Sequence, residues 1–559
     1  MHSNDPIPLS TNLKSLYTGS RAIRKPQVGR RVFYLSIQVI GNAILIGLIA
    51  KCLVYFIDGV TNLAFYGKLS FEPASPAGNH LGWLVLFVPI AGSLLVGLMA
   101  RFGSKAISGH GIPEAMEKII LDDSRIPPAI TFLKPLSAAI SIGTGGPFGA
   151  EGPIIATGGA FGSLTGQWIH ISSAERKIVL AAGACAGMSA IFGTPLAAML
   201  LAMELLLFEF SPRSIIPVGL ACVTGAGMHI LLFSSQPVFA MPAIPVPSIG
   251  ALSIYVLLGG VIGIIASFVS RSVYWIEDQF EKLPIHWMWW PAIGAIAIGV
   301  IGYFAPHTMG VGYDNIQWLL KGSWSLAMLG SLCLLKYLSW AISLGSGTSG
   351  GTLAPLFTIG GALGALLGLG IGHLLPGAGI DPATAALVGM AAMFAGASRA
   401  LLTSIVFALE ATGQVHGLLP VIGACLTAYF ISFFFMKGTI MTEKIKRRGV
   451  KTPELYEPDI LQSASVRQHM LPVKLDPTGK PWCYASDDLG LAAEIMGKHN
   501  TDSLIVLDET DPSRVIGMIT ARTLLAFYSG KRQKEHAYGS PGKTRRLLVQ
   551  GRKLMKSLF

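Results

Sequence analysis

A single carboxylate, Glu151, lies in the glycine-rich and otherwise apolar stretch GGPFGAEGP, Gly145 to Pro153. Glycines followed by a proline and then by an apolar run are typical of a helix N-terminus with Pro in its first turn. The free backbone N–H groups and the helix dipole at such a terminus bind anions. Because a charged side chain in apolar surroundings is costly, Glu151 is predicted to serve a function.

A second stretch repeats this pattern. The segment GTGGPFGAEGPIIATGGAFGSL (143–164) aligns with GSGTSGGTLAPLFTIGGALGAL (345–366) at a constant offset of 202, with nine of twenty-two positions identical. At an offset of 206, Gly183 meets Gly389 and Glu204 meets Glu410. Glycine-rich membrane sequence reaches such identity by composition as well, but the shared proline and the second block favour two related halves.

The elements that position these segments are predicted to be membrane helices. The 559 residues are 52% hydrophobic, only 13% are charged, and 66 are glycine, which excludes an ordinary soluble domain. Weakly charged runs long enough to cross a bilayer recur. Examples are 32–56, 81–100, 215–233, 287–304, 356–375 and 418–435. The fold class is therefore an all-α polytopic membrane protein.

Related halves indicate transport, because such repeats place a substrate site at their interface, often between broken helices. An alternative role for the glycines is close helix packing. We assign packing to Gly158, Gly162, Gly360 and Gly364, and function to the glycines around Glu151. The GxGxxG match at 345–350 is set aside, since no βαβ pattern surrounds it.

The charge distribution predicts the orientation in the membrane. Residues 1–31 are polar and basic without a cleavable signal, and a second basic cluster at 444–448 follows the last apolar run. The positive-inside rule then places both termini in the cytoplasm. For the net charge of +12, anionic lipid headgroups are a better partner than nucleic acid. The six cysteines lack CxxC spacing, so no zinc site, disulfide framework or other cofactor is expected.

Three motifs occur in the order GHGIP (109–113), GAEGP (149–153) and GTLAP (351–355), followed by FGTPLAAMLLAMEL (192–205) and ALEATGQ (408–414). In these motifs the chain resembles the CLC family of chloride channels and anion/proton exchangers. The resemblance covers most of the chain. It implies the CLC-type inverted repeat of short tilted helices and a homodimer with a separate pathway for chloride in each subunit.

The resemblance also implies roles for individual residues. Glu151 matches the family's gate, whose carboxylate competes with the anion and swings aside when protonated, so that transport depends on pH or voltage. The residues implied to bind the anion are His110, Gly111, Ile112, Gly149, Gly152, Thr352, Leu353, Ala354 and Met441.

The chain departs from the family motifs at several of these positions. His110 replaces the motif serine, Met441 aligns with the usual coordinating tyrosine, and Leu353 replaces a phenylalanine. The arginine of the gate motif is Ala150. These changes leave the anion preference open. For Met441 a packing role is as plausible as a functional one.

The inner proton relay is the other departure. Many exchangers of the family carry two consecutive acidic residues where this chain has Glu204 and Leu205. Leucine cannot bind a proton, which favours channel-like or weakly coupled anion flow. An anion/proton antiporter with a different inner relay, through Glu204 or ordered water, is the alternative.

The domain organisation follows from composition. A basic segment (1–31) precedes a transmembrane domain (32–449) with halves of about 32–240 and 250–449. Residues 455–530 alternate helix and strand patterns, resemble a CBS motif, and are expected to form a small cytosolic α/β domain before a basic tail (531–559). Thr523 stands where a ribose-contacting aspartate is usual, so adenine nucleotide binding is doubtful and pairing across the dimer is the simpler role.

Two other classes of protein fit the sequence less well. An intramembrane enzyme could use Glu151 and His110 as an acid–base pair, but no HExxH motif or nucleophile elbow accompanies them. A transporter for a larger solute needs a roomier polar cavity than these glycine-rich segments offer. We therefore expect an anion transporter that is not an enzyme, in a bacterial inner membrane.

Overall fold

The structure is a computed structural model that describes residues 28–121, 124–322, 324–450, 461, 464–473, 481–509, 511 and 514–538. Most of the predicted basic N-terminal segment (1–27) and most of the basic tail (539–559) lie outside the described residues. The chain divides into a helical unit, Val28–Glu454, and a second unit that contains the residues from Leu455 onward. Each unit is described by itself.

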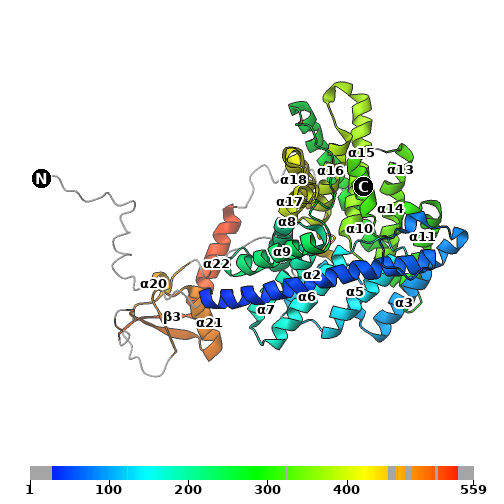
Figure 1. Ribbon diagram of the computed structural model, residues 1–559. Coiled ribbons are helices and arrows are strands. Elements are labelled where there is room, and N and C mark those ends of the chain that lie inside the picture. The colour runs from blue at the N-terminus through cyan, green and yellow to red at the C-terminus, as the bar shows by residue number, and fades with distance from the viewer. Residues whose placement is uncertain are drawn as a thin grey trace. The chain divides into compact units, whose positions relative to one another are not determined.

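The helical unit begins with a run of helices that carries the first two motifs (Figure 1). Its first half consists of α2 (Val28–Tyr66), α3 (Val88–Phe102), α4 (Ile112–Leu121), α5 (Pro128–Gly143), α6 (Glu151–Trp168), α7 (Ser173–Phe192), α8 (Pro195–Leu201), the π-helical turn η4 (Ala202–Leu207) and α9 (Pro212–Leu232). Here α6 packs along α7, and α7 packs against α9.

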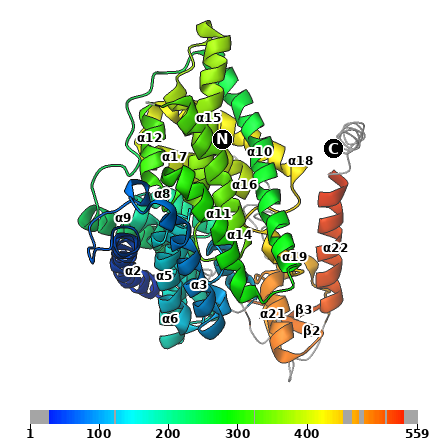
Figure 2. The same cartoon turned by 90° about the vertical axis from the view of Figure 1, so that its right-hand side faces the viewer.

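The second half of the helical unit carries the third motif. It consists of α10 (Ile249–Glu281), α11 (Trp290–Phe304), α12 (Tyr313–Lys321), α13 (Leu326–Gly330), the π-helical turn η7 (Ser331–Leu335), α14 (Lys336–Gly345), α15 (Leu353–Leu374), α16 (Pro382–Ser398), α17 (Leu401–Thr412), α18 (Leu418–Phe435) and α19 (Glu443–Arg447). Figure 2 shows α10, α15 and α16 in this half, where α15 packs along α16 as α6 does along α7.

Short 3-10 turns connect many of these helices. They are η1 (Pro76–Gly78), η2 (Gly82–Leu86), η3 (Lys105–Ile107), η5 (Trp287–Trp289), η6 (Pro306–Thr308), η8 (Pro376–Ala378) and η9 (Val415–Gly417). Several begin with Pro or follow a Ser or His whose side chain caps the first turn.

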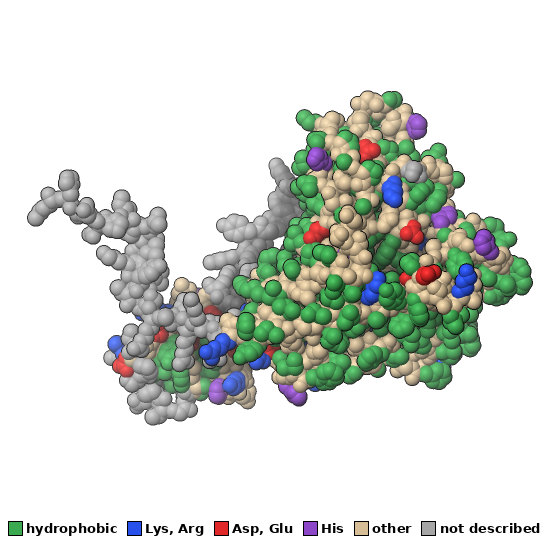
Figure 3. All heavy atoms as spheres, viewed as in Figure 1, with side chains coloured by type: hydrophobic (Ala, Val, Ile, Leu, Met, Phe, Trp, Pro, Cys, Tyr) green, Lys and Arg blue, Asp and Glu red, His purple; other side chains and the backbone are tan. Residues whose placement is uncertain are grey.

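Eight stretches within the described residues are long and apolar enough to cross a membrane. They are Gly29–Tyr66, Gly82–Phe102, Pro212–Leu232, Ile249–Glu281, Trp287–Phe304, Leu326–Gly345, Leu353–Leu374 and Val415–Phe435. On the face of the helical unit shown in Figure 3, hydrophobic side chains far outnumber charged ones. The chain is an integral membrane protein, as the composition predicts.

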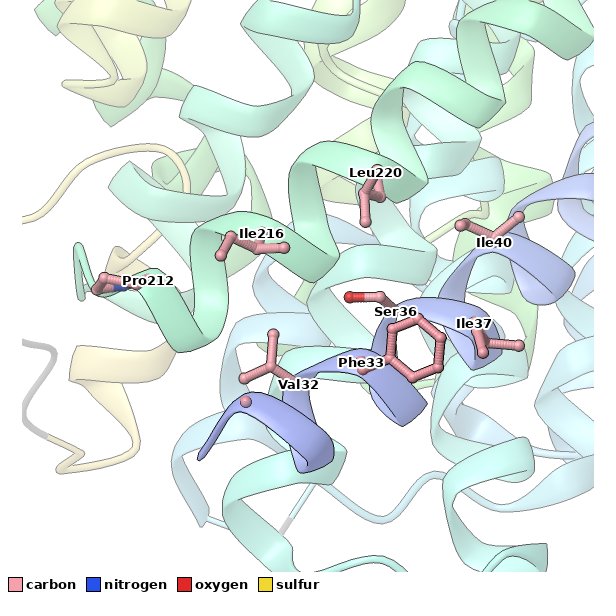
Figure 4. Close-up of a pocket in the computed structure, with 9 residues that line it drawn as sticks. Val32, Phe33, Ser36, Ile37, Ile40, Pro212, Ile216 and Leu220 are labelled. Carbon is pink, nitrogen blue, oxygen red and sulfur yellow. The ribbon is translucent and has the colours of Figure 1, made fainter. Parts of the chain in front are cut away.

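An apolar groove of about 470 Å³ opens on the outside of this unit between α2 and α9. Phe33 and Ile37 lie on one side and Ile216 on the other, with Ser36 as the polar member of the lining (Figure 4). The groove contains none of the residues of the three glycine motifs. Its exposed apolar walls suit lipid surroundings and do not form an anion pathway.

The C-terminal unit is the small α/β region expected from the sequence. It contains α20 (Val466–His469), β1 (Trp482–Tyr484), α21 (Leu489–His499), β2 (Ser503–Leu507), β3 (Val515–Thr520) and α22 (Ala521–Tyr538). The sheet order is β1-β2-β3, in which β1 is parallel and β3 antiparallel to β2. Cys483 pairs with Val506, and Leu504 with Ile519. These four side chains form its core together with Val466 and Leu489.

Candidate functional site

The loops of the three glycine motifs meet inside the helical unit. The backbone N–H of Gly109 donates to the carbonyl oxygen of Thr348 at 2.9 Å, and the N–H of Gly350 donates back to Gly109 at 3.4 Å. The N–H of Gly351 donates to the carbonyl oxygen of Gly149 at 3.1 Å. The starts of α4 and α6, from the first half, are therefore joined to the start of α15, from the second half.

This junction requires glycine at specific positions. Gly109 and Gly111 have φ angles of +101° and +95°, in the region where side chains are strained. A Cβ atom at Gly111 would collide with the carbonyl oxygen of Gly152, and one at Gly152 would collide with that of His110. The predicted anion-binding glycines thus let the backbones of two motif loops touch.

The predicted gate residue sits at this junction. Glu151 is the first residue of α6, and its side chain is fully buried. One carboxylate oxygen, Oε1, accepts a hydrogen bond from the backbone N–H of Ala354 in the first turn of α15. The other, Oε2, accepts from the hydroxyl of Tyr313 at 3.1 Å. The carboxylate therefore lies on two converging donors from the second half of the chain.

Tyr313 is not among the residues predicted from the sequence. It lies in GVGYD (310–314), which aligns with GHGIP (109–113) at an offset of 201. Tyr313 is the first residue of α12, and Gly312, with a φ of +76°, is the N-cap of this helix. The Tyr313 ring packs against Phe192 and Phe239, with centroids 5.7 and 5.8 Å away. Extending the internal repeat to this loop would have found the residue.

Two buried lysines hold the loops that lead into α4 and α12. The Nζ of Lys134 donates to the carbonyl oxygens of Ile107 and Gly109 at 2.7 and 2.8 Å. The Nζ of Lys336 donates to the equivalent carbonyls of Thr308 and Gly310, at 2.9 and 3.1 Å. The two lysines stand 202 positions apart, which is the offset of the repeat.

A buried base could pair with Glu151 in a salt bridge. Lys336 is a buried base in the second half, but its ammonium group is bonded to loop carbonyls. Among the described residues, the ion pairs found do not include Glu151. Its carboxylate is held by N–H and O–H donors, as at an anion site.

Two further predicted residues carry spare polar atoms at the junction. His110 is only 5% exposed, and its Nδ1 has no hydrogen-bond partner within the described part of the chain. Thr352, which precedes α15, likewise has a buried hydroxyl without a partner there. Glu114 accepts from the N–H of Gly111 at 2.7 Å and so caps α4. Buried polar atoms are normally paired, so these atoms mark a polar site.

The apolar members of the predicted set begin helices. Ile112 is the first residue of α4 and Leu353 the first residue of α15, and both side chains are fully buried. Since these side chains cannot donate hydrogen bonds, any contribution to anion binding comes from their backbone N–H groups.

Met441 belongs to the hydrophobic core of the helical unit and is fully buried. Its N–H donates to the hydroxyl of Thr439 at 3.2 Å, and the neighbouring carbonyl of Ile440 accepts from Tyr274 at 2.6 Å. These contacts hold the turn before α19. They do not connect Met441 to the three motif loops, and the thioether supplies no donor.

Glu204 caps a helix of the other half. Its Oε1 accepts from the N–H of Leu402, and its Oε2 accepts from both the N–H and the hydroxyl of Thr403, at 2.7 to 2.9 Å. Glu410 reciprocates, because its two oxygens accept from the N–H groups of Leu196 and Ala197 at 3.0 and 2.8 Å. Glu204 of the first half thus caps α17, and Glu410 of the second half caps α8. Leu205, beside Glu204, is buried.

Within the described residues, no group of three or more His, Cys, Asp or Glu side chains is placed to hold a metal ion. All six cysteines are free thiols.

The fold and this junction define a polytopic membrane protein in which helix N-termini from two halves of the chain converge on one buried carboxylate. A sequence profile of the family described as voltage gated chloride channel matches residues 91–433. The chain therefore belongs to the CLC family, transports chloride or a related anion, and is not an enzyme.

Known proteins agree with this assignment. The chain is 31% identical over 401 residues to the H(+)/Cl(-) exchange transporter ClcA of Yersinia pestis, a match that covers 69% of this chain and 82% of that protein. A slow cyanobacterial Cl−/H+ antiporter shares the fold with a TM-score of 0.66 and 23% identity, over 73% of this chain and 97% of the antiporter. A eukaryotic CLC transporter gives a TM-score of 0.61 and 21% identity, over 87% of each chain.

Proposed function

We propose that chloride or a similar small anion crosses the membrane between the starts of α4, α6 and α15, and that Glu151 is the gate. The observation that carries this proposal is the position of the Glu151 carboxylate on the Ala354 N–H and the Tyr313 hydroxyl. A carboxylate held by such donors fills the place of an anion. The anion can bind there only after the carboxylate has left.

Protonation supplies a physical reason for the gate to open. An ionised carboxylate is attracted to the positive ends of the helix dipoles, and a neutral carboxyl group is held much less strongly. A proton on Glu151 therefore favours release of the side chain and entry of the anion. Transport should accordingly depend on pH, and on voltage where the proton or anion crosses part of the membrane field.

The contacts near Glu204 favour channel-like flow with little proton coupling. Leu205 occupies the inner relay position with a buried apolar side chain, and Glu204 has both oxygens engaged in capping α17. A coupled proton would need another carrier on this side of the site.

Anion/proton exchange is the second candidate function. It is favoured by the printed names of ClcA and of the cyanobacterial structure, an exchange transporter and an antiporter respectively. In that case an ordered water chain or Glu204 would carry the proton past Leu205.

The assembly and orientation extend the proposal. We infer a homodimer with one pathway per subunit and both termini in the cytoplasm of a bacterial cell. The C-terminal unit would then act as a CBS-like pairing element. Residue 523 of this unit is a threonine, so it has no carboxylate with which to contact a ribose. Its hydroxyl bonds to that of Thr520 at 3.0 Å.

Replacing Glu151 tests the gate. Glu151→Gln keeps the size of the side chain but removes its charge, so we expect chloride flux that has lost most of its pH dependence. The measurement is chloride efflux from proteoliposomes between about pH 4.5 and 7.5, a range that spans ordinary carboxyl and histidine titration. Glu72→Gln, at an exposed residue outside the site, is the matched control. Wild-type pH dependence in the Glu151 variant would show that another group is the gate.

A further inference from the structure

The donors that hold the Glu151 carboxylate form a fork. The Ala354 N–H reaches one oxygen of the carboxylate and the Tyr313 hydroxyl reaches the other. Donors that each take one oxygen of a planar group recognise its shape as well as its charge. This fork, which we call the outer seat, remains in place as an unfilled pair of donors whenever Glu151 swings away.

We propose that Tyr313 is an anion ligand of the outer seat and that the seat binds a planar oxyanion, such as nitrate, in the manner of the carboxylate it replaces. The inference rests on the proposed role of Glu151 as a movable gate. It adds a specificity-determining hydroxyl from α12, a helix that carries none of the three motifs.

Tyr313 is fixed independently of Glu151. Its ring lies within a cluster of buried aromatic side chains from α7, the segment before α10, and α17, which are Phe192, Phe239 and Phe407. The loop in front of it is bonded through Gly310 to the buried Lys336. Asn315 lies two residues after Tyr313 in α12, and its side chain donates to the carbonyl oxygen of His307 at 2.7 Å.

Because both the ring and the loop are held by other groups, departure of the carboxylate leaves the hydroxyl in position. A donor that needs no rearrangement binds its next partner at lower cost. This preorganisation favours an anion that accepts from the freed hydroxyl.

The remainder of the site explains why a hydroxyl here matters. Met441 supplies no donor at the position where the family motif has a tyrosine, and the side chain of Leu353 is apolar. Tyr313 thus provides a phenolic donor from a different element. Two donors set to take two oxygens suit a planar oxyanion, whereas a spherical halide gains less from the fork.

The test measures anion binding with the seat emptied. Glu151→Ala removes the competing carboxylate, and the double variant Glu151→Ala/Tyr313→Phe removes only one further oxygen atom. Isothermal titration calorimetry of each full-length variant in detergent would measure the affinity of that variant for nitrate and for chloride. We expect the double variant to bind nitrate about tenfold more weakly than Glu151→Ala, because a hydrogen bond to an ion is lost, and chloride affinity to fall less.

The matched control is Glu151→Ala/Tyr337→Phe, since the Tyr337 hydroxyl donates to Ser272 at 2.6 Å and lies outside the seat. This control should bind both anions as Glu151→Ala does. Equal nitrate affinity with and without the Tyr313 hydroxyl would overturn the inference, as would an equal loss for nitrate and chloride.

Failure of this inference is distinguishable from failure of the proposed function. If vesicles that contain the wild-type protein conduct chloride under control of Glu151, but Glu151→Ala/Tyr313→Phe binds nitrate as tightly as Glu151→Ala does, only the inference is wrong. If Glu151→Gln leaves the pH dependence unchanged, the gate itself is wrong. Equal melting temperatures of the compared variants would confirm that the difference comes from binding and not from folding.

Discussion

His110 brings an imidazole to a junction where backbone groups do most of the bonding. Its side chain is buried, its Nδ1 is unpaired in the described structure, and its carbonyl touches Gly152. An imidazole nitrogen donates or accepts according to its tautomer, whereas the hydroxyl of the family motif can do both. The residue is therefore placed to alter which anions bind.

Replacing His110 by Ser tests this role. If the ring lines the pathway, we expect the ratio of nitrate or bromide flux to chloride flux to change by about threefold, the effect of one neutral hydrogen bond. Anion flux in proteoliposomes would measure this ratio. Unchanged selectivity would assign His110 to packing.

At the scale of elements, the reciprocal caps of α8 and α17 connect the two halves. Glu410 accepts from the first N–H groups of α8, and Glu204 accepts from those of α17. An N-terminal N–H that lies in apolar surroundings needs such a partner. These caps therefore stabilise helices that carry few polar groups of their own.

We expect Glu410→Gln and Glu204→Gln each to destabilise the protein by about 1–3 kcal/mol, because each replaces a charged acceptor by a neutral one with a single oxygen. Thermal unfolding in detergent, followed by tryptophan fluorescence, would measure the loss. Glu117→Gln is the control, since Glu117 pairs with the half-exposed Arg448, a type of ion pair that contributes little. A loss no greater than that of the control would contradict the capping role.

In the C-terminal unit, Asp487 is expected to make the folding stability depend on pH. Partial burial raises the pKa of this carboxyl, and the nearby Asp488 and Glu509 act in the same direction. A raised pKa in the folded state means that the contribution of Asp487 to stability is fully present below the ordinary pKa of aspartate. This contribution is lost as the pH rises through the raised value.

Asp487→Asn removes this loss while keeping an oxygen for the N–H of Tyr484, which now donates to Asp487 at 2.7 Å. We expect the variant to gain stability relative to wild type as the pH rises from about 4 to 7. Hydrogen exchange of β1 and β2 in the full-length protein, corrected for intrinsic rates, would measure the stability of both proteins. A stability difference between variant and wild type that stays constant over this pH range would contradict a raised pKa for Asp487.

The parts of the site that short sequence motifs mark could be predicted, and the parts that depend on contacts between distant residues could not. The three motif loops and Glu151 were predicted because glycine, proline and a lone carboxylate mark a helix start within a few residues. Tyr313 was not predicted, because its bond to Glu151 spans 162 positions and its loop lacks the motif proline. The cap made by Glu204 likewise depends on a helix 198 residues away.

At the scale of the whole molecule, the question is whether protons move with the anion. Leu205 is buried and Glu204 is occupied as a cap, so neither residue of this pair offers an unengaged carboxylate for a transported proton. A solved structure of the same fold is an antiporter, and one fold can host different functions.

We expect vesicles under a chloride gradient, with the voltage clamped by potassium and valinomycin, to show anion efflux with little proton uptake. A pH electrode and a chloride electrode in the same chamber would record both. Leu205→Glu restores an acid at the relay position, and its proton uptake should exceed that of the wild type. Strong uphill proton movement by the wild-type protein would instead establish exchange.

The seat of Glu151 is assembled from residues that are made at very different times. Glu151 and Ala354 are separated by 203 positions. At ordinary rates of synthesis the ribosome needs roughly 10 to 40 s to bridge that distance. For most of this interval the growing chain holds the carboxyl group of α6 while neither of its donors exists, because Tyr313 follows Glu151 by 162 positions and Ala354 comes later still. The first half must therefore be inserted in an unfinished state, and the anion site is completed only when the second half arrives.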